Sequence, residues 1–251
     1  MIRKVKILSH IILSSVVAGL LFTSCEEKKE EVNPKKDNKK ADLSILNKSQ
    51  SLNATLNGKV FSIPSPIETA LLLKEKGGDF DMSVLNDPSE VDKFSNANQK
   101  ALAMGIYGAD LGYATIYDQN QQSIKFIKSI EKLSTDLGIS GAFDKAIIDR
   151  FLENGNNQDS LLKFVSEAYG NGDRFLKENK REDVSIKILT GGWIESMHIA
   201  VQAAKANPVF LSRVGEQKHA VQSVLGLLSK IDSEQAKALT SKFKDLETIF
   251  D

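Results

Sequence analysis

The sequence has few of the side chains that most often carry out covalent chemistry, because its 251 residues include one cysteine and three histidines. A single thiol leaves no partner for a disulfide within the chain. One histidine, His10, lies in the N-terminal segment, and no Gly-x-Ser-x-Gly segment marks a serine nucleophile. We therefore identify no catalytic residue and no cofactor, and the sequence favours a protein without enzymatic activity.

An excess of charge of either sign is also missing, since there are 33 basic and 33 acidic residues. Residues 1–24 hold three bases and no acid, so the remainder of the chain carries three more acids than bases. Domains that bind nucleic acid usually carry a basic surplus that faces the phosphates. The composition thus predicts no nucleic-acid partner.

A hydrophobic run long enough to span a membrane is missing even at the N-terminus, where the sequence is most apolar. Three basic side chains in the first six residues precede an apolar run from Ile7 to Phe22, and small residues then lead to the lone cysteine, Cys25. A helix that spans a bilayer needs about 20 apolar residues, more than this run offers. We predict that residues 1–24 are a secretory signal peptide.

The end of that run, LFTSC at residues 21–25, resembles a bacterial lipobox, in which small residues precede a cysteine that is acylated and becomes the new N-terminus. The resemblance implies that Cys25 carries lipid of the palmitate type, which makes the membrane a partner. A free cysteine behind an ordinary signal is the alternative.

Residues 26–42, EEKKEEVNPKKDNKKAD, contain six acids, six bases and only two apolar side chains. Such a segment cannot bury a core, so residues 25–42 are predicted to form a disordered charged tether. Its acidic start resembles the signal that sends lipoproteins of Bacteroidetes-type bacteria to the outer face of the outer membrane. The resemblance implies an outer-membrane lipoprotein, with the cell surface favoured over the periplasmic face.

Prolines in the remaining chain mark the starts of helices. Ser65-Pro66-Ile67-Glu68 and Asp87-Pro88-Ser89-Glu90 each place an N-cap side chain directly before a proline. From these starts and from apolar stripes at helical spacing, we predict one all-α domain over 43–251, built as a multi-helix bundle or an array of antiparallel helical hairpins. About eight helices are expected, at about 66–76, 88–118, 120–137, 141–154, 158–179, 182–206, 208–230 and 233–249.

Asn57-Gly58, between two short apolar runs, predicts a short β-hairpin near 52–63. Two longer phrases, MGIYGADLGYA at 104–114 and TGGWIESMHIA at 190–200, align as a diverged repeat that would relate about 88–155 to 182–251, with chance similarity as the alternative. Together with IPSPIETALLLK, they resemble a family of all-helical lipoproteins of Bacteroidetes-type bacteria. That family has no established activity, so the resemblance implies a class and a location without a mechanism.

The glycines of GIYGADLG raise the question of a phosphate-binding loop. The segment lacks the Lys-Ser/Thr ending of such a loop, and it follows a helical pattern instead of a strand. On a helix, one face would be made of small residues and would predict a close contact with another helix. The residues of this face are Ala101, Gly105, Gly108, Ala109 and Gly112.

A second face of the same helix carries Asp110, Tyr113 and Tyr117. These side chains form either an internal hydrogen-bonded set or one wall of a ligand groove, which Trp193 and Glu195 would complete. A lone tryptophan in a helical chain is, however, more often part of the core.

Two Glu-x-x-His pairs, Glu195 with His198 and Glu216 with His219, each place two metal-ligand side chains on one helix face. Facing helices could bring the pairs together, although Glu216 and His219 point away from the apolar stripe of their own helix. The leading hypothesis is a lipid-anchored binding or interaction module of the cell envelope, with a protein or a small molecule as its ligand. The alternative is a metal-binding helical bundle.

Overall fold

The computed structural model describes residues 52–56, 59–142, 148–149, 151, 153 and 158–250. The contacts of the chain divide it into two units, residues 1–39 and 40–251, so every described residue belongs to the second unit. The expected signal peptide, Cys25 and the tether lie outside the described residues.

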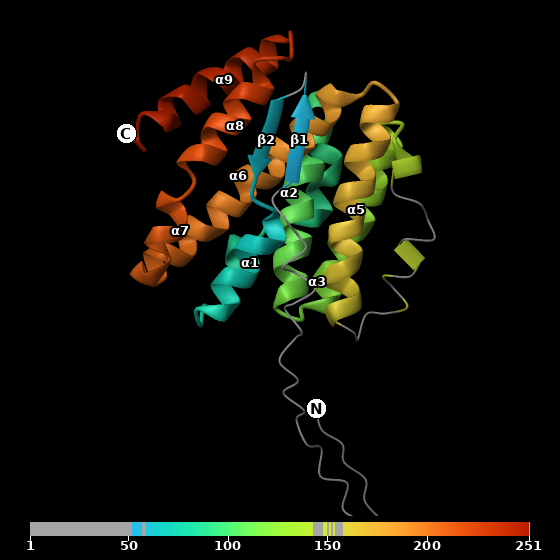
Figure 1. Cartoon of the computed structure of the whole chain (residues 1–251). Helices are drawn as coiled ribbons and strands as arrows, with labels where there is room; N and C mark the ends of the chain where they lie inside the picture. Colours follow the sequence, from blue (N-terminus) through green and yellow to red (C-terminus); the bar gives the residue numbers. More distant parts are fainter. Residues whose placement is uncertain are drawn as a thin grey trace, which may run out of the picture. The chain divides into compact units, whose positions relative to one another are not determined.

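Helices make up most of the described chain, which confirms the predicted all-α class (Figure 1). A β-hairpin precedes them, and short 3-10 turns, written η, link several of them. The elements in chain order are β1 (Leu52–Leu56), β2 (Lys59–Ile63), α1 (Pro66–Glu75), η2 (Met82–Val84), η3 (Pro88–Lys93), α2 (Ala97–Ile116), α3 (Asn120–Asp136), η4 (Ser140–Ala142), α5 (Gln158–Glu178), α6 (Glu182–Ala206), η5 (Pro208–Phe210), α7 (Leu211–Gly215), α8 (Lys218–Leu228) and α9 (Glu234–Glu247).

Several predicted boundaries are confirmed within a few residues. The helices expected at about 66–76, 120–137, 158–179, 182–206 and 233–249 correspond to α1, α3, α5, α6 and α9. Gly77 and Gly138 follow α1 and α3 with φ of 79° and 67°, the left-handed conformation that ends many helices and that glycine adopts without strain.

The predicted β-hairpin is also present. Strands β1 and β2 pair antiparallel, with Leu52 opposite Ile63 and Leu56 opposite Lys59. The turn residues 57 and 58 lie outside the described residues. Ile63, at the end of β2, is buried among side chains of α6 and α8, and this packing gives the hairpin the support that an isolated two-stranded ribbon lacks.

The single helix predicted over 88–118 is wrong, because the chain forms η3, leaves helical conformation at Phe94 and begins α2 at Ala97. The side-chain oxygen of Asn96 accepts a hydrogen bond of 3.0 Å from the backbone N–H of Gln99. This N-cap, which asparagine favours, starts a new helix where apolar periodicity alone suggested continuity.

The single helix predicted over 208–230 is likewise wrong, since η5, α7 and α8 replace it. Buried contacts fix the break between α7 and α8. The side-chain amide of Gln217 donates to the carbonyl of Arg213 and its oxygen accepts from the indole N–H of Trp193, each at 3.2 Å. Of the helix predicted over 141–154, Ile148–Asp149 and single residues at 151 and 153 are helical, and most of the rest lies outside the described residues.

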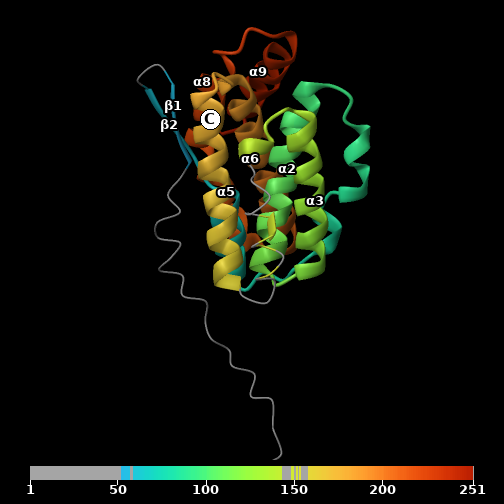
Figure 2. The ribbon, with the colours of Figure 1, turned by 90° about the vertical axis from the view of Figure 1, so that its right-hand side faces the viewer.

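Helix α2 lies in the middle of the fold and contacts α1, α3, α5 and α6 (Figure 2). The largest apolar cluster surrounds it and takes side chains from all of these helices. A second cluster joins the opposite side of α6 to β2, α8 and α9. Helix α6 therefore contributes to two cores, which explains why its residues 184–193 are buried all round.

A close contact between α2 and α6 brings together the two phrases that resemble each other, one on each helix. A Cβ atom added to Gly105 would lie 1.9 Å from the carbonyl oxygen of Ile188, and one added to Gly191 would lie 2.1 Å from that of Leu102. Further along α2, Gly112 faces the side chain of Ile67 on α1. The small-residue face of α2 thus serves close packing, as predicted. The internal repeat itself stays a prediction.

We expect Gly105→Ala to lower the free energy of unfolding by about 3 kcal/mol or more, because its methyl group would collide with the backbone of α6, which cannot yield without moving the helix. Gly170→Ala on α5 is the matched control, since nothing lies within 4 Å of its added Cβ. That control should raise the free energy by about 0.5–1 kcal/mol. Urea unfolding followed by circular dichroism measures both, and similar values for the two variants would contradict the packing described.

Candidate functional site

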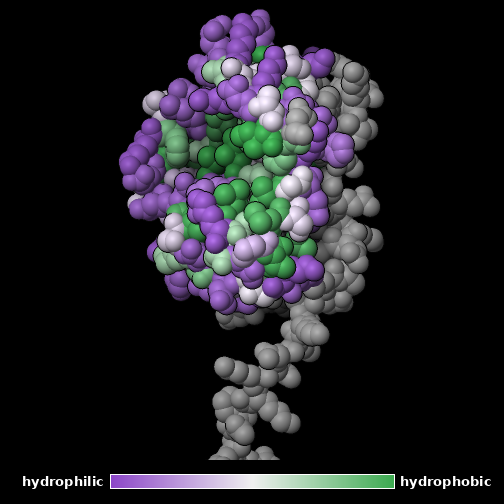
Figure 3. Space-filling view, turned by 90° about the vertical axis from the view of Figure 1, so that its left-hand side faces the viewer, coloured by the Kyte–Doolittle hydropathy of each residue, from purple (hydrophilic) through white to green (hydrophobic). Residues whose placement is uncertain are grey.

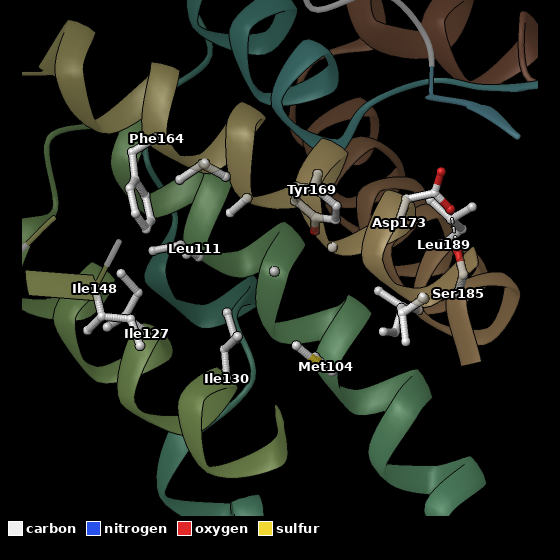
Figure 4. Close-up of a pocket in the computed structure, with 16 residues that line it drawn as sticks. Met104, Leu111, Ile127, Ile130, Ile148, Phe164, Tyr169, Asp173, Ser185 and Leu189 are labelled. Carbon is white, nitrogen blue, oxygen red and sulfur yellow. Dashed lines mark hydrogen bonds between the residues drawn. The ribbon is translucent and has the colours of Figure 1, made fainter. Parts of the chain in front are cut away.

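A cavity lined mainly by apolar side chains lies between α2, α3, α5 and α6 (Figure 4). Its volume is about 60 Å³. A cavity needs about 10–15 Å³ of such space to hold one water molecule, and a cavity of about 150 Å³ holds benzene, so this one holds only a few non-hydrogen atoms. Sixteen residues line the cavity: Met104, Gly108, Leu111, Ile127, Ile130, Ile148, Phe164, Val165, Ala168, Tyr169, Gly172, Asp173, Leu176, Ser185, Ile188 and Leu189.

One polar group at the cavity wall already has its partners within the protein. Asp173 accepts hydrogen bonds of 2.5 Å from the hydroxyl of Ser185 and from the ammonium group of Lys177, one on each carboxylate oxygen. The carboxylate is therefore both neutralised and hydrogen-bonded, which is what a partly buried charge requires.

Tyr169 is a further lining residue, and its hydroxyl occupies a notch in α2. A Cβ atom at Gly108 would lie 2.2 Å from this hydroxyl oxygen, and one at Gly192 would lie 3.6 Å from it. The oxygen is shielded from solvent and has no hydrogen-bond partner among the described residues. Burial, and then the charge of Asp110, raise the pKa of Tyr169, so its hydroxyl keeps its proton and remains a donor.

A pair of buried carboxyl groups, Asp110 on α2 and Glu195 on α6, lies near this hydroxyl. The exposed fraction of Asp110 is 0% and that of Glu195 is 5%, and the two carboxyl groups are close enough to influence each other's pKa. Asn86 donates to the same oxygen of Asp110 from its backbone N–H at 3.3 Å and from its side-chain amide at 3.1 Å. The loop between η2 and η3, which holds Asn86, is thereby tied to α2.

The two carboxyl groups cannot both be charged in this environment, because two adjacent negative charges would lack compensation. Burial, followed by the charge of Glu195, raises the pKa of Asp110 to about 8. Burial also raises the pKa of Glu195, against hydrogen bonds and the charge of His198, which lower it. One oxygen of each group lacks a donor among the described residues. A single proton on Asp110, donated to Glu195, would satisfy both.

Tyr113 and Tyr117 hold the loop that follows α1. The hydroxyl of Tyr113 accepts from the backbone N–H of Asp81 at 3.1 Å, and that of Tyr117 donates to the carbonyl of Gly78 at 2.9 Å. Phe80, from the same loop, stacks on Tyr113 with ring centroids 5.3 Å apart. These tyrosines therefore share a helix face with Asp110, and the chain from 78 to 86 covers that face.

Trp193 belongs to the second core cluster. Its indole N–H donates to Gln217, and its ring lies 5.4 Å from that of Phe243 on α9. Of the five residues that the sequence suggested for a groove, the structure brings Asp110 and Glu195 together, uses Tyr113 and Tyr117 to hold a loop, and places Trp193 in another cluster.

The residues suggested for a metal site lie in different surroundings. Glu195 faces Asp110, His198 is exposed, Glu216 forms an ion pair with Arg213 at 3.8 Å, and the ring of His219 contacts Gln222 at 3.3 Å. In the described part of the chain, no three or more His, Cys, Asp or Glu side chains are placed to hold one metal ion.

Several partly buried apolar side chains on α6, α8 and α9 pack against the Trp193 cluster. They include Ile194, Met197, Leu225, Leu239 and Leu246. Figure 3 shows an apolar hollow with polar side chains around it on the side of the molecule that holds α6 to α9.

Sequence reasoning did not find the cavity or Tyr169. The signal that could have indicated them is the pair Ala168 and Gly172, which lie four residues apart on α5, flank Tyr169 and line the cavity opposite Gly108.

Comparison with known proteins adds no assignment, since no protein family, curated protein or solved structure matches this chain. Among the helices described, none has both the length and the apolar character needed to cross a membrane. The role of the cavity is therefore argued from its geometry and chemistry.

We expect Asp110→Asn to become more stable relative to the wild type as pH rises from about 4 to about 8. The folded wild type retains a proton on Asp110 up to a pKa of about 8, whereas the unfolded chain releases it near pH 4, so the wild type loses stability across this window. Asparagine can still donate to Glu195 and carries no charge at any of these pH values.

Urea unfolding at pH 5 and pH 8 measures the difference between the variant and the wild type. The exposed Asp245→Asn on α9 serves as the control, and its difference from the wild type should stay nearly constant. A constant difference for Asp110→Asn as well would show that the carboxyl pair does not hold a proton as described.

Proposed function

We propose that this protein is a lipid-anchored lipoprotein of the outer membrane that binds a small apolar molecule in the cavity between α2, α3, α5 and α6. The observation that carries the binding role is the cavity itself, which is apolar on most of its wall and lies among four helices of one core. The signal-like N-terminus and the lipobox-like LFTSC segment support the lipid anchor on Cys25 and favour the cell surface over the periplasmic face.

The chemistry of the cavity wall favours binding over catalysis. Its titratable side chains are Asp173 and Tyr169. Asp173 is already paired with Lys177 and Ser185, and Tyr169 holds its proton. A general acid or base needs a pKa near the working pH and a free approach to the substrate. The lining supplies instead the apolar surface with few polar groups that is usual for small-molecule sites.

The size of the cavity limits the ligand. A packed protein interior holds few spaces larger than a water molecule, because unfilled space forfeits contacts between atoms. A small apolar molecule would restore these contacts and would stabilise the folded chain in proportion to its concentration. Ligands the size of benzene or larger would require the four helices to separate, because a cavity that holds benzene measures about 150 Å³.

Xenon, a single atom that dry apolar cavities bind, provides a direct test of binding. We expect xenon under pressure to raise the thermal midpoint of the full mature chain, prepared with Cys25→Ala so that no lipid is attached. Ala168→Leu should abolish this rise, because the larger side chain would fill the cavity. Gly170→Ala, two residues away on an exposed position of α5, should leave it intact. An unchanged midpoint of the parent chain under saturating xenon would contradict the proposed binding site.

For the anchor, we expect Cys25→Ala to abolish incorporation of a fatty-acid probe in the bacterial envelope, since no other thiol exists in the chain. Ser24→Thr, which leaves the cysteine in place, is the comparison variant. Continued labelling of Cys25→Ala would rule out lipid on this residue.

Surface display has a separate test. Protease added to intact cells should digest the domain if it faces outward, whereas disruption of the outer membrane should be needed if it faces the periplasm. Full protection in intact cells would overturn the cell-surface assignment and leave the lipid anchor unaffected.

A further inference from the structure

A groove on the surface lies between α3 and the chain from η2 to η3, apart from the enclosed cavity. The segment between α1 and α2 runs beside α3 (Figure 2), and η3 packs on that helix. The volume of the groove is about 700 Å³, which is within the range of sites for small organic molecules. None of its lining residues lines the cavity.

We propose that this groove binds a small organic anion, a molecule with an apolar body and a carboxylate that Lys125 and Lys128 hold. The site is a second one, and the proposal does not depend on a ligand in the cavity.

The positive charge of the groove comes from α3. Lys125 and Lys128 both line the groove and are three residues apart on this helix, so they lie on one helix face. Both are exposed, and neither forms an ion pair with a described residue, whereas Lys132 further along α3 is paired with Asp92. Two neighbouring ammonium groups repel each other, and an anion bound between them would offset that repulsion.

One acidic side chain, Asp87, also lines the groove and already has a partner. Its carboxylate accepts a hydrogen bond of 2.9 Å from the backbone N–H of Ser89. The charged residues of the lining are this aspartate and the two lysines. An excess of positive charge therefore faces a ligand in the groove.

Apolar side chains supply most of the groove surface. Phe126 of α3 is buried, Leu85 and Pro88 are half-buried, and Met82 exposes 56% of its surface. Methionine is flexible and polarizable, so it adapts to ligands of different shape. An anion with an apolar body would cover these side chains, which a fully hydrated ion would not.

Hydrogen bonds from the core hold the wall opposite α3. The hydroxyl of Ser129 donates to the carbonyl of Pro88 at 2.8 Å, and that of Tyr107 donates to the carbonyl of Asp87 at 3.1 Å. Asn86, from the same wall, donates to the aspartate of the buried carboxyl pair. The wall is therefore in place before a ligand arrives, which reduces the entropy lost on binding.

The length of the groove favours a small molecule over a protein segment. The α3 side of the lining runs from Gln122 to Ser129, a rise of about 10 Å along the helix. An extended peptide advances about 3.3 Å per residue, so only about three of its residues would lie in the groove.

Three ligands with the same alkyl chain test the preference for an anion: octanoate, the neutral octanamide and the cationic octylammonium. The full mature chain with Cys25→Ala would be labelled with ¹³C at its methionine methyl groups and observed by NMR. Beyond the expected signal peptide the methionines are Met82 in the groove, Met104 at the cavity and Met197 beside the Trp193 cluster. We expect octanoate to shift the Met82 signal at the lowest concentration and octylammonium at the highest, with Met104 and Met197 unshifted.

The double variant Lys125→Gln with Lys128→Gln tests the two lysines. We expect it to weaken octanoate binding by roughly 2- to 30-fold, the range for two exposed charge pairs, and to leave octanamide binding unchanged. Lys205→Gln with Lys242→Gln removes the same charge from exposed positions on α6 and α9. This control should bind both ligands like the parent chain.

The proposal fails if octanoate leaves Met82 unshifted, if octylammonium binds as tightly as octanoate, or if the double variant binds octanoate like the parent. A shift of Met82 by hexaglutamate but not by octanoate would assign the groove to an acidic peptide instead. A Met82 shift that grows with protein concentration alone would assign it to a second copy of the chain. Both results would overturn the proposal, and neither bears on the xenon test of the cavity.

Discussion

The close approach of α2 and α6 is the constraint on which the rest of this structure depends. Gly105 and Gly191 each face a backbone carbonyl of the other helix at a distance that leaves no room for a Cβ atom. Once these turns of α2 and α6 are in contact, the positions of the side chains further along both helices are set as well. Asp110 and Glu195 meet away from water, and their burial requires them to share a proton and to use Asn86 as a donor.

The same contact accounts for the position of the cavity. Gly108, one turn beyond Gly105, leaves a notch that the hydroxyl of Tyr169 enters from α5. Ala168 and Gly172 on α5 contribute little side-chain volume to the region that Gly108 of α2 also lines. The space between the two helices is therefore not filled. The glycine-rich face of α2 that allows close packing on α6 therefore also leaves incomplete packing between α2 and α5. The proposed ligand would bind there.

Local signals predicted much of the fold. Proline after a capping residue, glycine at helix ends and apolar stripes placed α1, α3, α5, α6 and α9 within a few residues, and Asn57-Gly58 predicted the hairpin. Two predicted helices were wrong at points where the hydrogen bonds of a polar side chain set a helix boundary. Asn96 caps a new helix in one case. In the other, Gln217 bonds to Trp193 and to the carbonyl of Arg213, a pairing that depends on residues distant in the chain.

The sequence by itself determined the all-α class and the small-residue face of α2. These follow from residue types at local spacing, and such spacing is independent of the partner across the core. Only the tertiary structure decided which face each polar group meets. Asp110 lies against Glu195, and the hydroxyl groups of Tyr113 and Tyr117 bond to loop backbone. The hydroxyl of Tyr169 occupies a notch at Gly108. The physical reason is that a buried polar group takes its pKa and its role from its neighbours in space, which helix periodicity does not specify.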